Sequence, residues 1–282
     1  MTLQVIEIGL RQVKGATIES AGYDQLVVTG GPHVYADPDW ARFEEWVEDR
    51  MPLHDGVERV GISTPGLLDP ATGVVRMFPA AKWTDRPLEA RLARVYGVPV
   101  HLLSDGEAHA HAHMSLFAKP LVALAFDSTI AFGWANADSH IVRPRADRNF
   151  DIGEWQIPTH ADNTSLWWAL GDEGFSELLE LEKTEAGALR HWGFRLGRFI
   201  SSLAAVLQPR TVVLSGSRIV LHWAQVEPPL RAAVTRHKPA WLEPPAIVQT
   251  PFGEESGLLG IASYLSKIAG SEGNPKWRSA VE

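Results

Sequence analysis

The chain has 282 residues, 45% of them hydrophobic and 21% charged, which is typical of a folded globular protein and excludes a disordered or fibrous one. The formal net charge is −8 and there is no block of Lys or Arg, which argues against a nucleic-acid-binding surface. The absence of cysteine excludes disulfides, thiolate nucleophiles and Cys-based zinc sites. No apolar run reaches the roughly 18 residues that span a bilayer, and the first residues carry no export signal. We therefore expect a cytoplasmic protein that contacts neither membrane nor nucleic acid.

The first part of the chain alternates apolar strand patterns with helical ones. The predicted elements are strands at 3–8, 13–19 and 25–29, a helix after Asp37, a strand at 57–63, a helix at 87–96, a strand at 99–103 and a helix from 104 to about 116. Strands that alternate with helices in this way indicate the α/β class.

The second part repeats this organisation. The predicted elements are strands at 121–126, 129–135 and 140–143, a polar loop at 143–151, a helix at 184–207, a strand from 211 that runs into a Gly-containing turn, another helix, a strand at 246–250 and a helix at 257–267. We therefore expect the chain to form two α/β lobes. The smaller lobe is 1–118, and we expect a last helix at about 254–268 to return to it. The larger lobe is 119–253, and 269–282 is a flexible tail.

Several segments resemble one known family when they are read together. They are GISTPGLLDPATGVV at 61–75, LLSDGEA at 102–108, GE at 153–154, PRTVVLSG at 209–216 and GLLGIA at 257–262. In this order they are similar to motifs of the ROK family of sugar kinases and sugar-responsive repressors. The resemblance extends over about residues 3–268.

The resemblance implies an actin-like, ribonuclease H-like fold with two α/β lobes. It also implies ATP-dependent phosphorylation of a hexose or a related polyhydroxylated compound, with Mg-ATP as the cofactor if the protein is active. Asp105 matches the family's catalytic aspartate, which accepts the proton of the sugar hydroxyl as a general base. Spacing alone favours an ordinary helix N-cap for Asp105. The family's zinc-binding Cys cluster has no counterpart, so we expect no zinc.

The resemblance also implies which residues contact the sugar. They are Pro65, Gly66, Ser104, Asp105, Glu107 and Glu154. The family's His after the GE pair is absent here, and Trp167 and Trp168 stand near the place of its next sugar-contacting Glu. Together with Trp155, these indoles either line an altered sugar pocket or belong to the core of a shortened lobe.

The two phosphate-binding segments of the family are altered in this chain. The nucleotide contacts that the resemblance implies are Glu7, Gly9, Arg11, Ser128, Thr129, Gly133 and Gly216. In the first segment, Leu10, Arg11 and Gln12 replace a Gly, a Thr and a Lys, and the Cβ of Leu10 disfavours the open backbone conformations that approach phosphate. In the second segment, at 127–133, Asp127 adds a negative charge where phosphate would bind.

Two functions therefore remain open. The first is a carbohydrate kinase, and the second is a catalytically inactive protein that binds a sugar or effector and has lost ATP binding. A DNA-binding repressor is not expected, because the chain is acidic and no helix-turn-helix pattern precedes Leu3.

The sequence also bears on metal binding and on assembly. The histidines His101, His109, His111 and His113 form a cluster that is either solvated, hydrogen-bonded or a metal pair formed by His109 and His113. We also expect a homodimer whose interface includes the helix at 184–207, because exposed apolar surface commonly marks interfaces.

Overall fold

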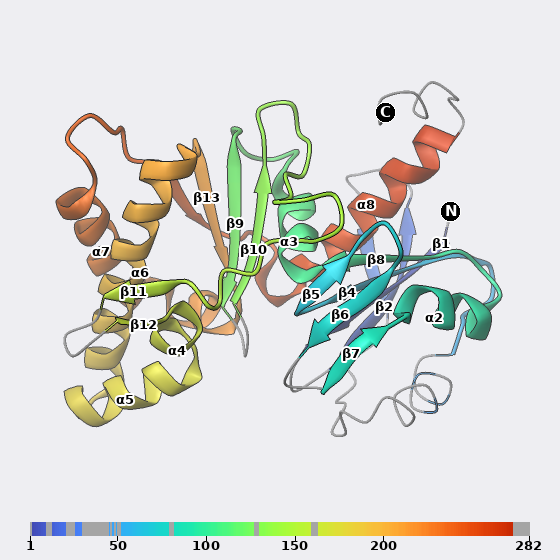
Figure 1. The fold of residues 1–282 in the computed structure, drawn as a ribbon, viewed down its shortest axis with the longest axis horizontal. Helices are drawn as coiled ribbons and strands as arrows, with labels where there is room; N and C mark the ends of the chain where they lie inside the picture. Colours follow the sequence, from blue (N-terminus) through green and yellow to red (C-terminus); the bar gives the residue numbers. More distant parts are fainter. Residues whose placement is uncertain are drawn as a thin grey trace. The chain divides into compact units, whose positions relative to one another are not determined.

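The computed structural model describes residues 2–9, 13–20, 26–29, 45, 47, 49, 52–78, 82–126, 130–158 and 163–272. The chain divides into two compact units (Figure 1). Unit 1 consists of Met1–Ala112, Pro144–Asn149 and Gly257–Glu282, and unit 2 consists of His113–Arg143 and Phe150–Ser256. Over the described part of the chain, no helix combines the length and the apolar character that a membrane crossing needs.

Unit 1 is built on a five-stranded sheet in the order β3-β2-β1-β4-β8. These strands are β1 Thr2–Ile8, β2 Val13–Ser20, β3 Leu26–Thr29, β4 Val57–Thr64 and β8 Val100–Ser104. The first three form an antiparallel meander, whereas β4 runs parallel to β1 and β8 runs parallel to β4. The carboxyl ends of β1, β4 and β8 therefore meet at one edge of the sheet.

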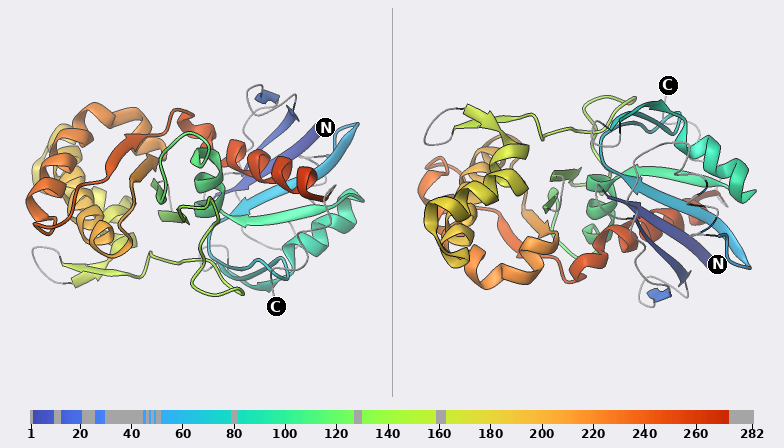
Figure 2. Two further views of the ribbon diagram at one scale, coloured as in Figure 1. Left: turned by 90° about the horizontal axis from the view of Figure 1, so that it is seen from above. Right: turned by 90° about the horizontal axis from the view of Figure 1, so that it is seen from below.

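Alternate side chains of β1 pack on opposite faces of this sheet, as the two-residue period of a strand requires. Leu3 and Val5 belong to a core with the helices α3 Asp105–His113 and α8 Ser256–Glu272, the second of which crosses the sheet in Figure 2. Ile6 and Ile8 belong to the core on the opposite face. That core also holds α2 Leu88–Tyr96 and a small sheet of β5 Leu67–Asp69, β6 Val74–Phe78 and β7 Trp83–Arg86.

Unit 2 is built on a four-stranded sheet in the order β10-β9-β13-β14. Its strands are β9 Leu121–Phe126, β10 Ile130–Ala135, β13 Thr211–Ser215 and β14 Ala246–Gln249, and only β10 runs antiparallel to its neighbour. Its helices are α4 Leu166–Leu170, α5 Asp172–Glu182, α6 Glu185–Leu207, α7 Ser217–His237 and the short 3₁₀ helix η2 Gly253–Glu255. A two-stranded ribbon, β11 Gln156–Pro158 with β12 Asn163–Ser165, precedes α4.

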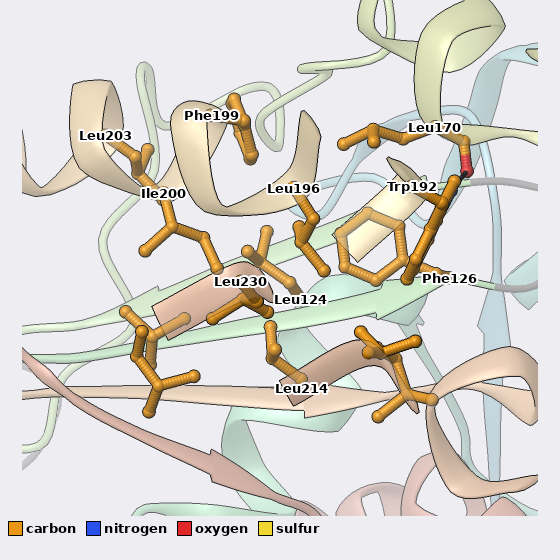
Figure 3. Close-up of a cluster of buried hydrophobic side chains, with 14 of the residues drawn as sticks. Leu124, Phe126, Leu170, Trp192, Leu196, Phe199, Ile200, Leu203, Leu214 and Leu230 are labelled. Carbon is orange, nitrogen blue, oxygen red and sulfur yellow. Dashed lines mark hydrogen bonds between the residues drawn. The ribbon is translucent and has the colours of Figure 1, made fainter. Parts of the chain in front are cut away.

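The core of unit 2 lies between this sheet and α6. Leu124, Leu196 and Leu214 meet there with the fully buried Trp192 (Figure 3). The indole N–H of Trp192 donates to the carbonyl oxygen of Leu170 at 2.9 Å, so the one polar atom of this side chain is satisfied inside the core.

The strands predicted along most of the chain are confirmed to within about one residue, but the prediction of a strand at 140–143 is wrong. Asn136 accepts the backbone N–H groups of Asp138 and His140 and forms a tight turn. The returning segment then makes a single bridge, between Ala135 and Ile141. Pro144, which has no N–H to donate, follows Ile141 three residues later, so pairing does not continue. The helix predicted after Asp37 falls mostly outside the described residues.

Candidate functional site

The predicted catalytic residue, Asp105, lies at the carboxyl edge of the unit 1 sheet. It follows directly after β8 and is the first residue of α3. The Pro65–Gly66 loop follows β4 and Gly9 follows β1 at the same edge, because the three strands are parallel. The carboxyl edge of parallel strands is where open α/β sheets bind ligands. The fold thus brings together Gly9, Pro65, Gly66 and Asp105, which are far apart in the sequence.

The residue that caps α3 is Ser104 rather than Asp105. The Ser104 hydroxyl accepts the backbone N–H of Glu107 at 3.3 Å, and the Glu107 carboxylate accepts the backbone N–H of Ser104 at 3.5 Å. This reciprocal pair is a capping box, for which the S-x-x-E spacing is the sequence signal. Ser104 and Glu107 are both 3% exposed, whereas Asp105 is partly exposed. The simple N-cap interpretation of Asp105 is therefore wrong, because Ser104 caps the helix.

The Pro65–Gly66 loop is held by a residue that the sequence reasoning missed. The Asn149 side chain accepts the backbone N–H of Leu68 at 2.7 Å and donates to the carbonyl oxygen of Gly66 at 3.0 Å. Asn149 is 7% exposed, so water competes little for these bonds. Because 81 positions separate Asn149 from Leu68, no local pattern signals this contact.

Gly66 itself is required by the backbone. Its φ is +97°, and a Cβ at this position would contact the carbonyl oxygen of Met77. Only glycine adopts this conformation without strain, so the loop conformation depends on it. Asn149 and Gly66 together fix the backbone beside the carboxyl end of β4.

Glu7 lies at the end of β1, on the sheet face that α8 covers. In the sheet it is paired with Ser63 of β4. A Cβ built on Gly257, at the start of α8, would lie 2.7 Å from a Glu7 carboxylate oxygen, so the carboxylate approaches the α8 backbone closely. The absence of a side chain at position 257 leaves room for the Glu7 carboxylate.

The residues predicted to contact nucleotide are only partly described. Arg11, Ser128 and Thr129 lie outside the described residues. Gly133 is not in a turn, because it lies inside β10, where it pairs with Ala123 of β9. Gly216 follows β13 with a φ of +96°, and a Cβ there would collide with the backbone of Phe126. The 127–133 segment is therefore a strand from Ile130 onward, which agrees with the strand predicted at 129–135.

In unit 2, Glu154 lies in an exposed turn that leads into β11. The backbone N–H of Trp155 donates to the carbonyl oxygen of Ile152 at 3.0 Å and closes this turn. Glu154, Trp155 and Trp167 are exposed, whereas Trp168 is partly buried. The structure therefore does not place Trp155 and Trp167 in the core.

The histidines of α3 are not solvated. His109, His111 and His113 are 4%, 8% and 0% exposed. The imidazole of His113 is hydrogen-bonded to the Thr250 hydroxyl at 2.9 Å, and the ring of His111 lies 5.1 Å from that of Tyr264. Among the described residues, no group of three or more His, Asp or Glu side chains is arranged to hold a metal ion.

Comparison with known proteins gives matches in sequence and in fold. No protein-family model matches the chain. Over 69 residues the chain is 35% identical to a protein from Caldicellulosiruptor sp. (strain Rt8B.4) described as "Putative xylose repressor". This match covers 24% of the chain and only 17% of the length of that relative.

The solved structures match over nearly the whole chain. A ROK family glucokinase from Streptomyces griseus, in complex with glucose and AMPPNP, superposes with a TM-score of 0.73 at 16% identity, over 94% of this chain and 99% of that one. A ROK family protein from Streptococcus pneumoniae TIGR4, in complex with sucrose, gives 0.76 at 17% identity, over 96% and 100%. A ROK family transcriptional regulator, a homologue of the E. coli MLC protein, gives 0.73 at 15% identity, over 94% and 78%. The resemblance to the ROK family that the sequence motifs predict is thus confirmed, and the chain has the two-lobed, actin-like α/β fold of that family's sugar kinases and regulators.

Proposed function

We propose that the chain binds a sugar or a similar polyhydroxylated ligand and phosphorylates one of its hydroxyl groups, with Asp105 as the general base. The observation that carries this proposal is the capping box. Ser104 and Glu107 cap α3, so the partly exposed carboxylate of Asp105 is not needed as the cap. The glucokinase of the same fold, solved with glucose and AMPPNP, supports the assignment to this class of reaction.

The chemistry asked of Asp105 is a proton transfer. A sugar hydroxyl is a weak nucleophile, and a carboxylate within hydrogen-bond reach accepts its proton as the oxygen forms its new bond. Asp105 lies directly after a buried strand and at a helix N-terminus, where the positive end of the helix dipole attracts a negative charge. Pro65, Gly66 and Glu154 are the further sugar contacts that we propose.

The described residues include some of the groups that would bind Mg-ATP. When bound, Mg-ATP supplies the phosphoryl group, and its Mg²⁺ ion neutralises negative charge on the phosphates. The Glu7 carboxylate is an oxygen donor of the kind that Mg²⁺ prefers, and Gly9 and Gly216 leave backbone without a side chain beside the ends of β1 and β13. Arg11, in place of the family's Thr, carries a guanidinium that can pair with phosphate.

A second function is favoured by a different observation, namely the altered phosphate segments of the sequence. Leu10, Gln12 and Asp127 each remove or oppose a phosphate contact. The alternative is a protein that binds a sugar or effector and does not bind ATP. The match to a ROK family transcriptional regulator supports this alternative, because the same fold also occurs in a regulator.

The test is to measure sugar and Mg-ATP binding by calorimetry and phosphoryl transfer by release of ADP, with D-glucose as the first acceptor. For the kinase, Asp105→Asn is expected to lower turnover by about 10²–10⁴-fold while the fold and sugar binding remain, because the base acts only in the chemical step.

Asp55→Asn is the matched control, since Asp55 is an exposed carboxylate in a turn of the same unit. Equal loss of turnover in both variants would remove Asp105 from the mechanism. Sugar binding without any Mg-ATP binding would establish the alternative function.

A further inference from the structure

A short basic turn of unit 1 has no part in the function proposed so far. The backbone N–H of Arg148 donates to the carbonyl oxygen of Arg145 at 3.3 Å, and the two residues form an isolated antiparallel bridge. Residues that face each other across such a bridge carry their side chains on the same side. Arg145 and Arg148 therefore project from one face of this turn, and residues 145–148 are called the arginine turn below.

The positive charge of the arginine turn is only partly neutralised. The Asp147 carboxylate lies 3.1 Å from the Nε of Arg145 and 3.5 Å from an Nη of Arg148, so one carboxylate serves two guanidinium groups. The side chain of Arg148 is 42% exposed, yet its Nε is buried and has no hydrogen-bond partner among the described residues. A buried N–H without an acceptor is unfavourable, and carboxylates and phosphates are the strongest acceptors for a guanidinium.

The arginine turn is held close to the proposed catalytic residue. Asn149, which directly follows the turn, is hydrogen-bonded to the backbone of the Pro65–Gly66 loop at 3.0 Å. The parallel strands β4 and β8 pair Thr64 with Ser104, so the next residues of the two strands, which begin this loop and α3, are neighbours at one edge of the sheet. The loop therefore connects the arginine turn, through Asn149, with Asp105.

We propose that Arg148, together with Arg145, binds an anionic group on the sugar whose hydroxyl Asp105 deprotonates. The group is a carboxylate or a phosphate, because the planar fork of N–H groups on a guanidinium matches two oxygens of either one. The bound group supplies the acceptor that the buried Nε of Arg148 lacks, and it takes the place of Asp147 between the two guanidinium groups. The substrate class is then an acidic sugar rather than a neutral hexose. This inference rests on the proposed function and narrows its substrate.

The experiment is calorimetric titration of the full chain at one fixed ionic strength. The ligands are D-glucose, D-glucose 1-phosphate, D-glucose 6-phosphate and D-glucuronate, with inorganic phosphate titrated alone. The two sugar phosphates carry the anion at opposite ends of the molecule, and D-glucuronate carries a carboxylate in place of a phosphate. At least one acidic sugar is expected to bind about tenfold more tightly than D-glucose, because hydrogen bonds between charged groups are the stronger ones.

The variants change the arginine turn in opposite directions. Arg148→Gln is expected to raise the Kd for that acidic sugar about 10- to 100-fold and to change the Kd for D-glucose far less. Arg148→Lys keeps the charge without the fork and is expected to lie between the two. Asp147→Asn removes the competing carboxylate and is expected to lower the Kd about two- to fivefold, which a misfolded variant does not do. The control is Arg94→Gln, an exposed arginine of α2 in the same unit.

The outcomes separate this inference from the function on which it rests. Wild-type protein that binds none of the sugars overturns sugar binding and the anion subsite together. Wild-type protein that binds D-glucose as tightly as every acidic sugar overturns the subsite alone, and so does an acidic sugar whose Kd is the same in Arg148→Gln and wild type. Inorganic phosphate that binds as tightly as the sugar phosphates also overturns it, because the arginine turn then binds a free anion without the sugar.

Discussion

At the scale of single residues, the environment of a side chain decides its role more than its type does. Asp105 and Glu107 are carboxylates two positions apart, yet Glu107 is buried in a capping box and Asp105 is partly exposed. Asn136 and Asn149 both accept backbone N–H groups, but only Asn149 does so in a buried place. Burial removes the competing water, so the same bond contributes more to stability there.

The first prediction concerns this difference. Asn149→Ala leaves the buried N–H of Leu68 without its acceptor and is expected to cost about 1–3 kcal/mol of unfolding free energy. Asn136→Ala, in an exposed turn where water replaces the side chain, is expected to cost clearly less. Urea unfolding measures both, and hydrogen exchange at the Leu68 amide reports the loop directly. Equal costs in the two variants, or unchanged exchange at Leu68, would show that Asn149 does not hold the loop.

The second prediction concerns Glu89 of α2, which accepts the backbone N–H of Leu102 at 3.1 Å on the free edge of β8. Burial raises the pKa of the Glu89 carboxyl, and the bond from Leu102 lowers it only in part. Since the folded-state pKa is raised, this group's contribution to stability is full below its ordinary value of 4.5 and is lost as the pH rises through the folded-state pKa.

Glu89→Gln keeps the acceptor for Leu102 and removes the charge. We measure the unfolding free energy of both proteins in urea from pH 5 to pH 7. The value for the Gln variant minus that for the wild type is expected to increase as the pH rises, by about 1 kcal/mol or less. Glu89→Ala, which also removes the acceptor, serves as the comparison and is expected to be less stable than Gln at every pH. A difference between Gln and wild type that does not vary with pH would contradict the assignment.

At the scale of elements, α8 determines how unit 1 is packed. Leu258, Ile261 and Leu265 place one side of this helix in the core with β1 and α3. Gly260 allows close approach, because a Cβ there would collide with the backbone of Ala108 in α3. Two backbones in contact cannot move apart without disturbing the whole layer, unlike a flexible side chain.

Gly260→Ala is accordingly expected to destabilise the protein by about 1–3 kcal/mol through overpacking. The control is Gly270→Ala in the same helix, where a Cβ meets nothing within 4 Å. That exchange is expected to stabilise by about 0.5–1 kcal/mol, since alanine is the better helix former. Thermal unfolding of the two variants gives the comparison, and a stabilised Gly260→Ala would disprove the close packing of α8 on α3.

At the scale of the whole molecule, unit 2 leaves several large apolar side chains exposed. Leu181, Val206 and Leu221, which come from α5, α6 and α7, are 61%, 69% and 68% exposed. Exposed apolar surface commonly marks an interface, and a two-fold dimer is the commonest assembly. A dimer through the α6 region therefore stays a prediction of both the sequence and the exposed surface.

Size exclusion with light scattering at micromolar concentration is expected to give twice the chain mass of 31.0 kDa. Val206→Asp places a charge at the C-terminal end of α6 and is expected to shift the particle toward the monomer. Leu181→Asp, on α5, tests whether the interface extends beyond α6. A single species at the monomer mass for the wild-type chain would end the proposal.

The sequence by itself determined the class of fold, most strand boundaries and the place of Asp105. Those features follow from local periodicity and from short motifs, because a strand buried on both faces, such as β9, is apolar at every position whatever its neighbours are. The S-x-x-E capping box is also a local feature of the sequence, in which Ser104, not Asp105, is the cap. The small sheet β5-β6-β7 and the helices α4 and α5 were not predicted, because their segments are short and half-exposed.

Only the tertiary structure decided the rest. The bonds from Asn149 to Gly66 and Leu68 join segments about 80 residues apart, and no local pattern encodes such a pair. The segment 140–143 pairs with β10 through a single bridge, between Ala135 and Ile141, and an apolar run alone does not show how far such pairing extends. The sequence also did not determine whether Trp155 and Trp167 are buried or exposed, because tryptophan occurs both in cores and on surfaces. Burial and long-range hydrogen bonds are properties of the assembled chain, which is why only the structure showed what surrounds the carboxylates that the sequence predicts for a site.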